Sequence, residues 1–203
     1  CFWEDTDGPF ESIVCKKWSN IEILKGMMQR LLPTAPFEYK MIQGIDFYQY
    51  ISAFAKGFDN VEWIASKILS INTAHGGARV QWEGGAANAD YVFSSIHGDR
   101  IQSALWQHFK GIVVEFDDAV FDKSVARLMD FNVPQMDATA FMYLLPITDK
   151  KALVEYTLFS PSMLESAQYD LVLNAYLEEH YKGQTYQIQH TEIGAIPMTS
   201  KKL

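Results

Sequence analysis

ALVEYTLFS, residues 152–160, alternates apolar and other side chains with the two-residue period of a β-strand. Glu155 interrupts the apolar character in the middle of this stretch. Because strand side chains alternate between faces, Glu155 points to the same side as Leu153 and Thr157. Two interpretations stay open at this point: Glu155 lies on a solvated sheet face, or it lies in an apolar cavity and does chemistry there.

Strand follows strand along much of the chain, with short turns and without a regular βα alternation. This order favours an α+β fold whose sheet is mainly antiparallel, with helices packed against it. We expect strands at 17–24, 37–41, 61–71, 77–85, 89–98, 105–116, 127–135, 139–148 and 151–160, with a closing extended segment at 184–198.

Two segments have apolar residues at helical spacing. The first spans 46–58, with Asp46 as N-cap or first-turn acid. The second spans 164–182, and Gly183 follows it as a natural C-terminal cap. We expect both helices to pack outside or beside the sheet.

Composition excludes some classes of function. The 203 residues are 48% hydrophobic and carry a formal net charge of −8. An acidic surface repels phosphate backbones, so we expect no nucleic-acid partner, and any membrane contact has to be apolar. The two cysteines form no CxxC pair, and the five histidines have no metal-ligand spacing, so we expect no metal site.

Standard catalytic motifs are also missing from the sequence. There is no GxGxxG and no phosphate-binding P-loop, and the paired glycines at 76–77 and 84–85 read as turns. Ser94, His97 and Asp99 contain the residue types of a hydrolytic triad, but their close spacing in one loop is not triad geometry. Carboxylates are better candidates: Asp130 and Glu155 both lie in apolar strands, and neighbouring strands can bring them into one pocket.

Four ordered motifs give a specific resemblance. LMDFNVPQ (128–135), FMYLLP (141–146), ALVEYT (152–157) and EIGAIPMT (192–199) resemble those of bacterial lycopene cyclases, and CFWED, KKWSNIEI, YKMIQGIDFYQYI and LWQHFKGIVVE upstream also fit. The resemblance covers essentially the whole chain. It implies a flavoprotein with a p-hydroxybenzoate-hydroxylase-like FAD/NAD(P)-binding fold, in which a mostly antiparallel sheet binds the substrate.

The resemblance also implies the reaction, a non-redox closure of the acyclic ends of lycopene into β-ionone rings. The family requires reduced FAD, usually obtained with NAD(P)H. Such a site needs an acid, a base and a negative charge near a carbocation, in a cavity that excludes water. Because this substrate is apolar, we expect a cytoplasmic protein that associates peripherally with the inner membrane.

The family pattern assigns roles to single residues. Glu155 matches the first glutamate of the Phe-Leu-Glu-Glu-Thr pattern of the plant enzymes, and Tyr156 stands at the second. We therefore predict Glu155 as a catalytic residue for cation stabilisation or proton transfer. Asp130 matches the family's Met-Asp motif, as a second candidate that is either catalytic or structural. Asn132 stands where many relatives carry an arginine, and its uncharged side chain cannot form a salt bridge there.

The expected organisation is that of an interior portion of a longer protein. Residues 1–100 would be the flavin-side region and residues 101–203 the substrate-binding sheet and helix. The glycine-rich FAD motif would precede Cys1 and a flavin-contacting segment would follow Leu203, so we expect this chain alone to bind no FAD and to be inactive. SSIHG (94–98) occupies the place of a DGRG-like turn. The alternatives are a flavin-dependent monooxygenase for an apolar substrate and a non-catalytic carotenoid or lipid carrier.

Overall fold

The computed structural model describes residues 1–5, 7–74, 76–95 and 105–198. The chain divides into two compact units in this description: residues 1–47 with 102–203, and residues 48–101. The functional division predicted at residue 100 stays a prediction. The structure shows in addition that strands from the first 47 residues belong to the same unit as the second half of the chain.

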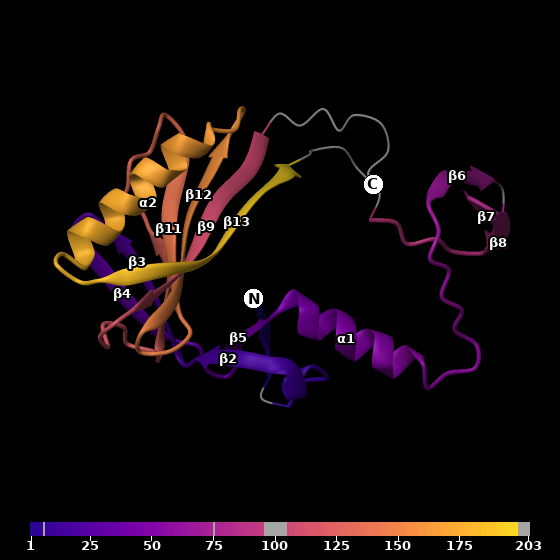
Figure 1. Ribbon diagram of the computed structural model, residues 1–203, viewed down its shortest axis with the longest axis horizontal. Coiled ribbons are helices and arrows are strands. Elements are labelled where there is room, and N and C mark those ends of the chain that lie inside the picture. Colours follow the sequence, from indigo (N-terminus) through magenta and orange to yellow (C-terminus); the bar gives the residue numbers. More distant parts are fainter. Residues whose placement is uncertain (6, 75, 96–104, 199–203) are drawn as a thin grey trace. The chain divides into compact units, whose positions relative to one another are not determined.

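The larger unit is built on a sheet that contains seven strands among the described residues (Figure 1). The predicted antiparallel sheet is confirmed, since all neighbouring strands are antiparallel except β10 and β3, which are parallel. In spatial order the strands are β13 (Tyr186–Met198), β9 (Leu105–Phe116), β12 (Lys151–Ser160), β11 (Thr139–Pro146), β10 (Val125–Asp130), β3 (Asn20–Lys25) and β4 (Met28–Pro33).

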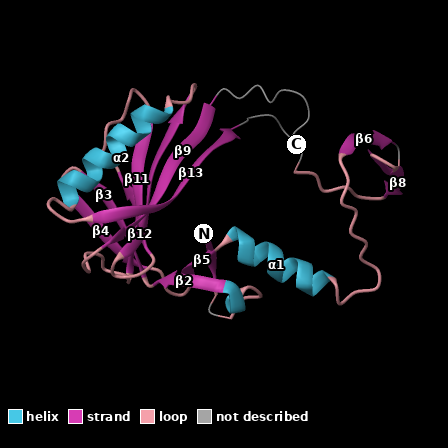
Figure 2. Ribbon diagram, viewed as in Figure 1, coloured by secondary structure: helices cyan, strands magenta, loops and turns pink. Residues whose placement is uncertain are grey.

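Helix α2 (Ser166–His180) covers one face of this sheet, as Figure 2 shows, and lies against β9 and β12. Its N-terminus is closed by a capping box between Glu165 and Gln168, which satisfies backbone donors that have no partner inside the helix. The predicted apolar stripe is buried against the sheet and forms the main core with the even-numbered residues of β12: Tyr169, Val172, Leu173, Tyr176, Leu177, Ala152, Val154, Tyr156 and Leu158.

The opposite face of the sheet carries a second, smaller core. Here Trp18 and Tyr39 pack with Ala126 and Leu145, and Tyr143 and Leu153 lie against them. Trp18 and Tyr39 come from a further three-stranded sheet of the described chain, in the order β1 (Phe2–Glu4), β5 (Glu38–Ile42), β2 (Val14–Trp18). The Trp18 indole N–H donates to the Pro146 carbonyl at 2.8 Å, so the two sheets are joined by a buried hydrogen bond as well as by packing.

The smaller unit contains most of α1 (Gly44–Ala55) and three strands of the described chain, β6 (Ile68–Ala74), β7 (Gly77–Trp82) and β8 (Gly85–Ala89). The predicted hairpin is confirmed as β6 and β7, but its first strand starts at residue 68 rather than 61. No residue of α1 is buried; the ring of Tyr50 stacks on Phe54, and Phe54 contacts the tilted ring of Phe58. Packing of this helix on the sheet stays a prediction.

The strand predicted at 89–98 is wrong over residues 90–95, since only Ala89, the last residue of β8, is in a strand. Residues 91–95 form no strand, and the side chains of Tyr91 and Phe93 are 83% and 98% exposed. A strand needs a neighbour to satisfy its backbone donors and acceptors, and an apolar local pattern does not supply one.

Within the described residues, no helix is both long and apolar enough to cross a membrane.

Candidate functional site

Glu155 lies in the middle of β12, on the face that carries the smaller core. Its neighbours Val154 and Tyr156 point to the other face, into the core under α2, as the alternation predicts. Across the strands, Glu155 is directly opposite Tyr143 of β11 and Gly111 of β9. The side chain is partly buried, so the interpretation of Glu155 as a freely solvated surface acid does not fit its surroundings.

The surroundings of Glu155 favour its protonated form. Burial raises its pKa to about 7, and the charge of Glu192 and a hydrogen bond with that residue act in the same direction. The Thr157 hydroxyl donates to Oε1 of Glu155 at 2.8 Å and opposes this shift. A carboxyl group with a pKa near 7 holds and releases a proton at neutral pH, which is the requirement for general acid–base work.

Two tyrosines lie close enough to Glu155 to sense its charge. Burial raises the pKa of Tyr39 to about 12 and also raises the pKa of Tyr143, and the carboxylate of Glu155 adds to both shifts. Both phenols are therefore neutral at pH 7. They give the carboxyl group an aromatic environment that can stabilise a nearby cation.

Asp130 has different partners, and they lie on the other face of the sheet. The Tyr176 hydroxyl of α2 donates to its Oδ2 at 2.9 Å, and the backbone N–H of Asn132 donates to its Oδ1 at 3.0 Å. Nη1 of Arg127 lies 3.7 Å from Oδ2. At 1% exposure, Asp130 is a buried acid with a hydrogen-bond donor on each carboxyl oxygen.

A β-bulge explains why Asp130 and Arg127 act together. Residues three apart on a regular strand point to opposite faces, but the register of β10 against β11 shifts between these two positions. Both side chains consequently reach α2, where Arg127 donates to the Tyr176 hydroxyl at 2.9 Å and, through Nε, to Glu22 at 2.6 Å. The pocket expected to unite Asp130 with Glu155 is not formed, because the two carboxyl groups lie on opposite faces.

The positions flanking the Met-Asp motif have structural contacts. Arg127, on the same strand as Asp130, forms a salt bridge with it. Asn132 itself accepts a hydrogen bond from the backbone N–H of Gly26 at 2.6 Å and donates to the Gly26 carbonyl at 3.3 Å. It therefore fastens the turn between β3 and β4 to the end of β10.

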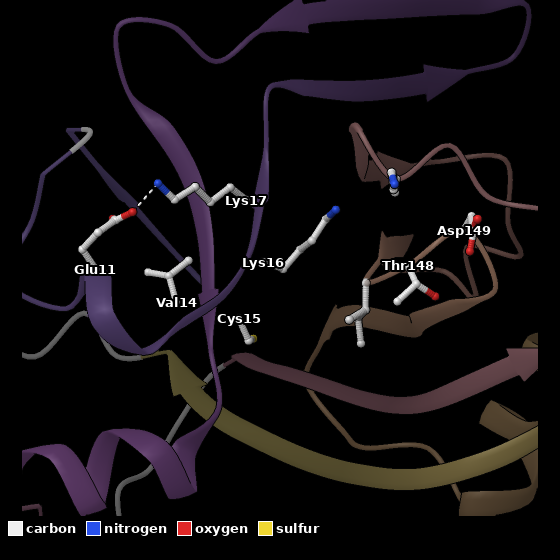
Figure 3. Close-up of a pocket in the computed structure, with 9 residues that line it drawn as sticks. Glu11, Val14, Cys15, Lys16, Lys17, Thr148 and Asp149 are labelled. Carbon is white, nitrogen blue, oxygen red and sulfur yellow. Dashed lines mark ion pairs between the residues drawn. The ribbon is translucent and has the colours of Figure 1, made fainter.

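The pocket drawn in Figure 3 contains neither predicted catalytic acid. It has a volume of about 460 Å³ and is lined by Glu11, Val14, Cys15, Lys16, Lys17, Lys123, Ile147, Thr148 and Asp149. An ion pair joins Glu11 to Lys17 on its wall. Burial and the neighbouring charge of Lys123 lower the pKa of Lys16 there. Charged walls of this kind do not suit a hydrocarbon substrate.

Among the described residues, no cluster of three or more His, Cys, Asp or Glu side chains could hold a metal ion. The phosphate cradle that a dinucleotide needs is a glycine-rich turn opening a helix, and the sequence has no GxGxxG. The expectation that this chain alone binds no FAD stays a prediction. Two members of the candidate hydrolytic triad, His97 and Asp99, lie outside the described residues. Most of the SSIHG turn also lies outside them.

A family model described as "Lycopene cyclase protein" matches residues 1–202. The chain belongs to the lycopene cyclase family. A comparison with curated protein sequences finds no significant match to this cyclase-family chain. The predicted membership, which depended on the four motifs, is confirmed.

Solved structures show the same fold. Similar ones include a geranylgeranyl bacteriochlorophyll reductase-like protein from Thermoplasma acidophilum, with TM-score 0.60 and 12% identity over 94% of this chain and 52% of that one. The halogenase PltM in complex with phloroglucinol and FAD has TM-score 0.57 and 12% identity, over 93% and 45% of the two chains. A flavoprotein/dehydrogenase from Cytophaga hutchinsonii has TM-score 0.54 and 9% identity, over 89% and 50%.

These likenesses confirm the predicted fold class, a mostly β architecture of the p-hydroxybenzoate-hydroxylase type with mixed and antiparallel sheets. The cyclase-family chain spans about half the length of the structures it matches. The catalytic roles of Glu155 and Asp130 stay predictions.

Two residues that lie beside Glu155 in the structure have no role that the sequence alone predicts. Glu192 belongs to the closing motif, and Gly111 is one residue of a long strand. The available signal was an isolated glycine inside an apolar strand, which often marks a close approach by another group.

Proposed function

We propose that this chain is the substrate-side part of a lycopene β-cyclase and that Glu155 is its catalytic acid–base residue. The observation that carries the proposal is a partly buried carboxyl group with a pKa of about 7, on the strand that carries the family's glutamate motif. Family membership supports an acyclic carotenoid as the substrate.

In the proposed reaction, the carboxyl group of Glu155 first donates a proton and later accepts one. Glu155 gives its proton to the terminal double bond of lycopene, which leaves a tertiary carbocation. The neighbouring internal double bond attacks the cation and closes the ring, and loss of a ring proton to the carboxylate gives the β-ionone product. One proton is given and one is returned, so the reaction involves no net oxidation or reduction. The carboxylate also stabilises the cation while it exists.

The neighbouring side chains would serve the same reaction. Water would convert the cation to an alcohol, so the aromatic residues that surround Glu155 have to keep it out. Tyr39 and Tyr143 can add cation–π stabilisation of about 2 kcal/mol when desolvated. We propose that the full-length protein works with reduced FAD obtained with NAD(P)H. The flavin's cradle would come from outside this chain.

Location is part of the proposal, because lycopene dissolves in membranes. We place the protein in the cytoplasm, peripheral at the inner membrane. Exposed apolar side chains on β4 and the turn before it support such contact, since Met27 is 104% exposed and Leu31 is 56% exposed.

The test is Glu155→Gln in the full-length protein, expressed in bacteria that accumulate lycopene. Glutamine keeps the size and hydrogen bonding of the side chain but neither titrates nor carries charge. We expect cyclic product to form about a hundredfold more slowly or worse, which corresponds to about 3 kcal/mol of barrier.

The matched control is Glu178→Gln, which removes an exposed acid from α2 and should leave pigment formation unchanged. Wild-type amounts of cyclic product from Glu155→Gln would contradict the catalytic role. Binding of lycopene without ring closure by the wild-type protein would favour the carrier alternative.

A further inference from the structure

Three strands place Glu155, Gly111 and Glu192 in one row across the sheet. Glu155 of β12 pairs with Gly111 of β9, and Gly111 pairs with Glu192 of β13 on its other side. Residues paired in this way point to the same face, so both glutamates stand on the face of the smaller core. Their backbones are separated by two strand spacings, about 10 Å, and only the side chains can close that distance.

Because Gly111 has no side chain, it leaves space in which the side chains of Glu155 and Glu192 can approach each other. A Cβ atom at this position would lie 3.1 Å from both Cγ and Oε1 of Glu192, and 3.2 Å from Cδ1 of Leu153. These distances are tighter than ordinary van der Waals contact, which shows that Glu192 leans over the glycine toward β12. Any larger residue would hold the two carboxyl groups apart.

Glu192 is exposed, and both its charge and a hydrogen bond between the two carboxyl groups raise the pKa of Glu155. A pair of ionised carboxylates has only acceptors, so such a bond requires that one of them holds a proton. Other groups act on this pair. Thr157 donates to Glu155, whereas Tyr39 of β5 and Tyr143 of β11 are neutral. His190 precedes Glu192 by two residues on β13.

We infer that Glu192 is a positioning residue for the acid–base step: it shares one proton with Glu155 across Gly111 and keeps Glu155 supplied with it. This inference deepens the function proposed above and rests on it. Before reaction the pair holds one proton and one negative charge. After the proton passes to lycopene, the carbocation faces two carboxylates, and the proton lost from the ring restores the starting pair.

Glu192→Gln in the full-length protein tests the inference. Glutamine removes the like charge and donates an N–H to Glu155, and both changes lower the pKa of Glu155. The reaction needs the protonated acid, so the wild-type rate should fall as pH rises through about 7. In the variant this fall should move at least one pH unit lower, which costs about tenfold in rate at pH 7.5 and is largely recovered at pH 5.

Gly111→Ala is a second variant that changes no charge. Its methyl group should push Glu192 away from Glu155 and move the profile in the same direction, by less. Glu115→Gln is the control, because this exposed acid lies on the same strand and face as Gly111 and should keep the wild-type profile. A general loss of structure would lower the rate at every pH and would not be recovered at pH 5.

Infrared difference spectra of the full-length variants give a readout that needs no activity. The band of the protonated carboxyl group should titrate near pH 7 in the wild type, be missing in Glu155→Gln and titrate lower in Glu192→Gln. An unchanged band in Glu192→Gln would overturn the shared proton, and a moved band with an unmoved pH–rate profile would overturn its role in catalysis. A wild-type protein that forms no cyclic product but shows the titrating band would instead refute the proposed function.

Discussion

Asp130 and Glu155 are both acids in apolar strands, but their hydrogen-bond partners differ in kind. Asp130 receives hydrogen bonds from a hydroxyl and a backbone N–H and has an arginine nearby, all of which stabilise its charge. Glu155 has one hydroxyl donor and a second carboxyl group as neighbours. A proton carrier has to change its charge within the pH range of the reaction, and the pKa of Glu155, about 7, meets this requirement.

Tyr176→Phe separates the structural and catalytic options for Asp130. The change removes the phenol that donates to Asp130 and accepts from Arg127, leaving a buried acid with fewer donors. We expect the free energy of unfolding to fall by about 1–3 kcal/mol, measured by urea denaturation, with activity per folded full-length molecule unchanged.

The control for this experiment is Tyr181→Phe, which removes a phenol just after the same helix. It should have a smaller effect, because its ring packs beside Phe116 and Phe121 and is retained by phenylalanine. A large loss of activity in Tyr176→Phe without loss of stability would assign Asp130 to the catalytic machinery instead.

At the scale of whole elements, the sequence predicted best where one face of a strand is buried. The strand at 105–116 and the strand at 151–160 both have the predicted bounds, because alternation reports burial directly. The bulge in β10 has no such signal, and it decides on which face Asp130 lies. The placement of Glu155 and Glu192 in one row could not be predicted from the sequence either. It depends on the pairing of β13 with β9, and strand pairing is set by the whole fold.

The end of α2 offers a test at this scale. Gly183 follows the helix with a φ of +79°, and open space surrounds the position where its Cβ would be. Gly183→Ala should therefore destabilise the protein through backbone strain alone, by about 1 kcal/mol. Thermal unfolding of Gly183→Ala beside Lys182→Ala checks this, because the lysine variant should melt like the wild type. Equal melting of both variants would contradict the strained turn.

For the molecule as a whole, the proposed membrane contact has a defined surface, the β4 edge with Met27 and Leu31. Because the net charge of the chain is −8, its attraction to bilayers has to be apolar and insensitive to salt. The double change Met27→Ser and Leu31→Ser in the full-length protein should reduce co-flotation with phosphatidylethanolamine–phosphatidylglycerol liposomes severalfold.

Leu171→Ser is the matched control, since this leucine is 71% exposed on α2, away from β4. It should leave flotation unchanged. If both variants lose the same amount of binding, or neither loses any, contact through the β4 edge is refuted.

The parallel pairing of β3 with β10, fastened by Asn132 and Gly26, has a consequence for biosynthesis. These two residues are 106 positions apart in the chain. At roughly 5–20 residues per second, the ribosome needs about 5–20 s to deliver β10 after β3 has been made. During that time the hairpin of β3 and β4 has no β10 to pair with. The unpaired edge of β3 and the apolar side chains of the hairpin are then accessible to other nascent chains. Chaperone demand during translation should therefore concentrate in this interval.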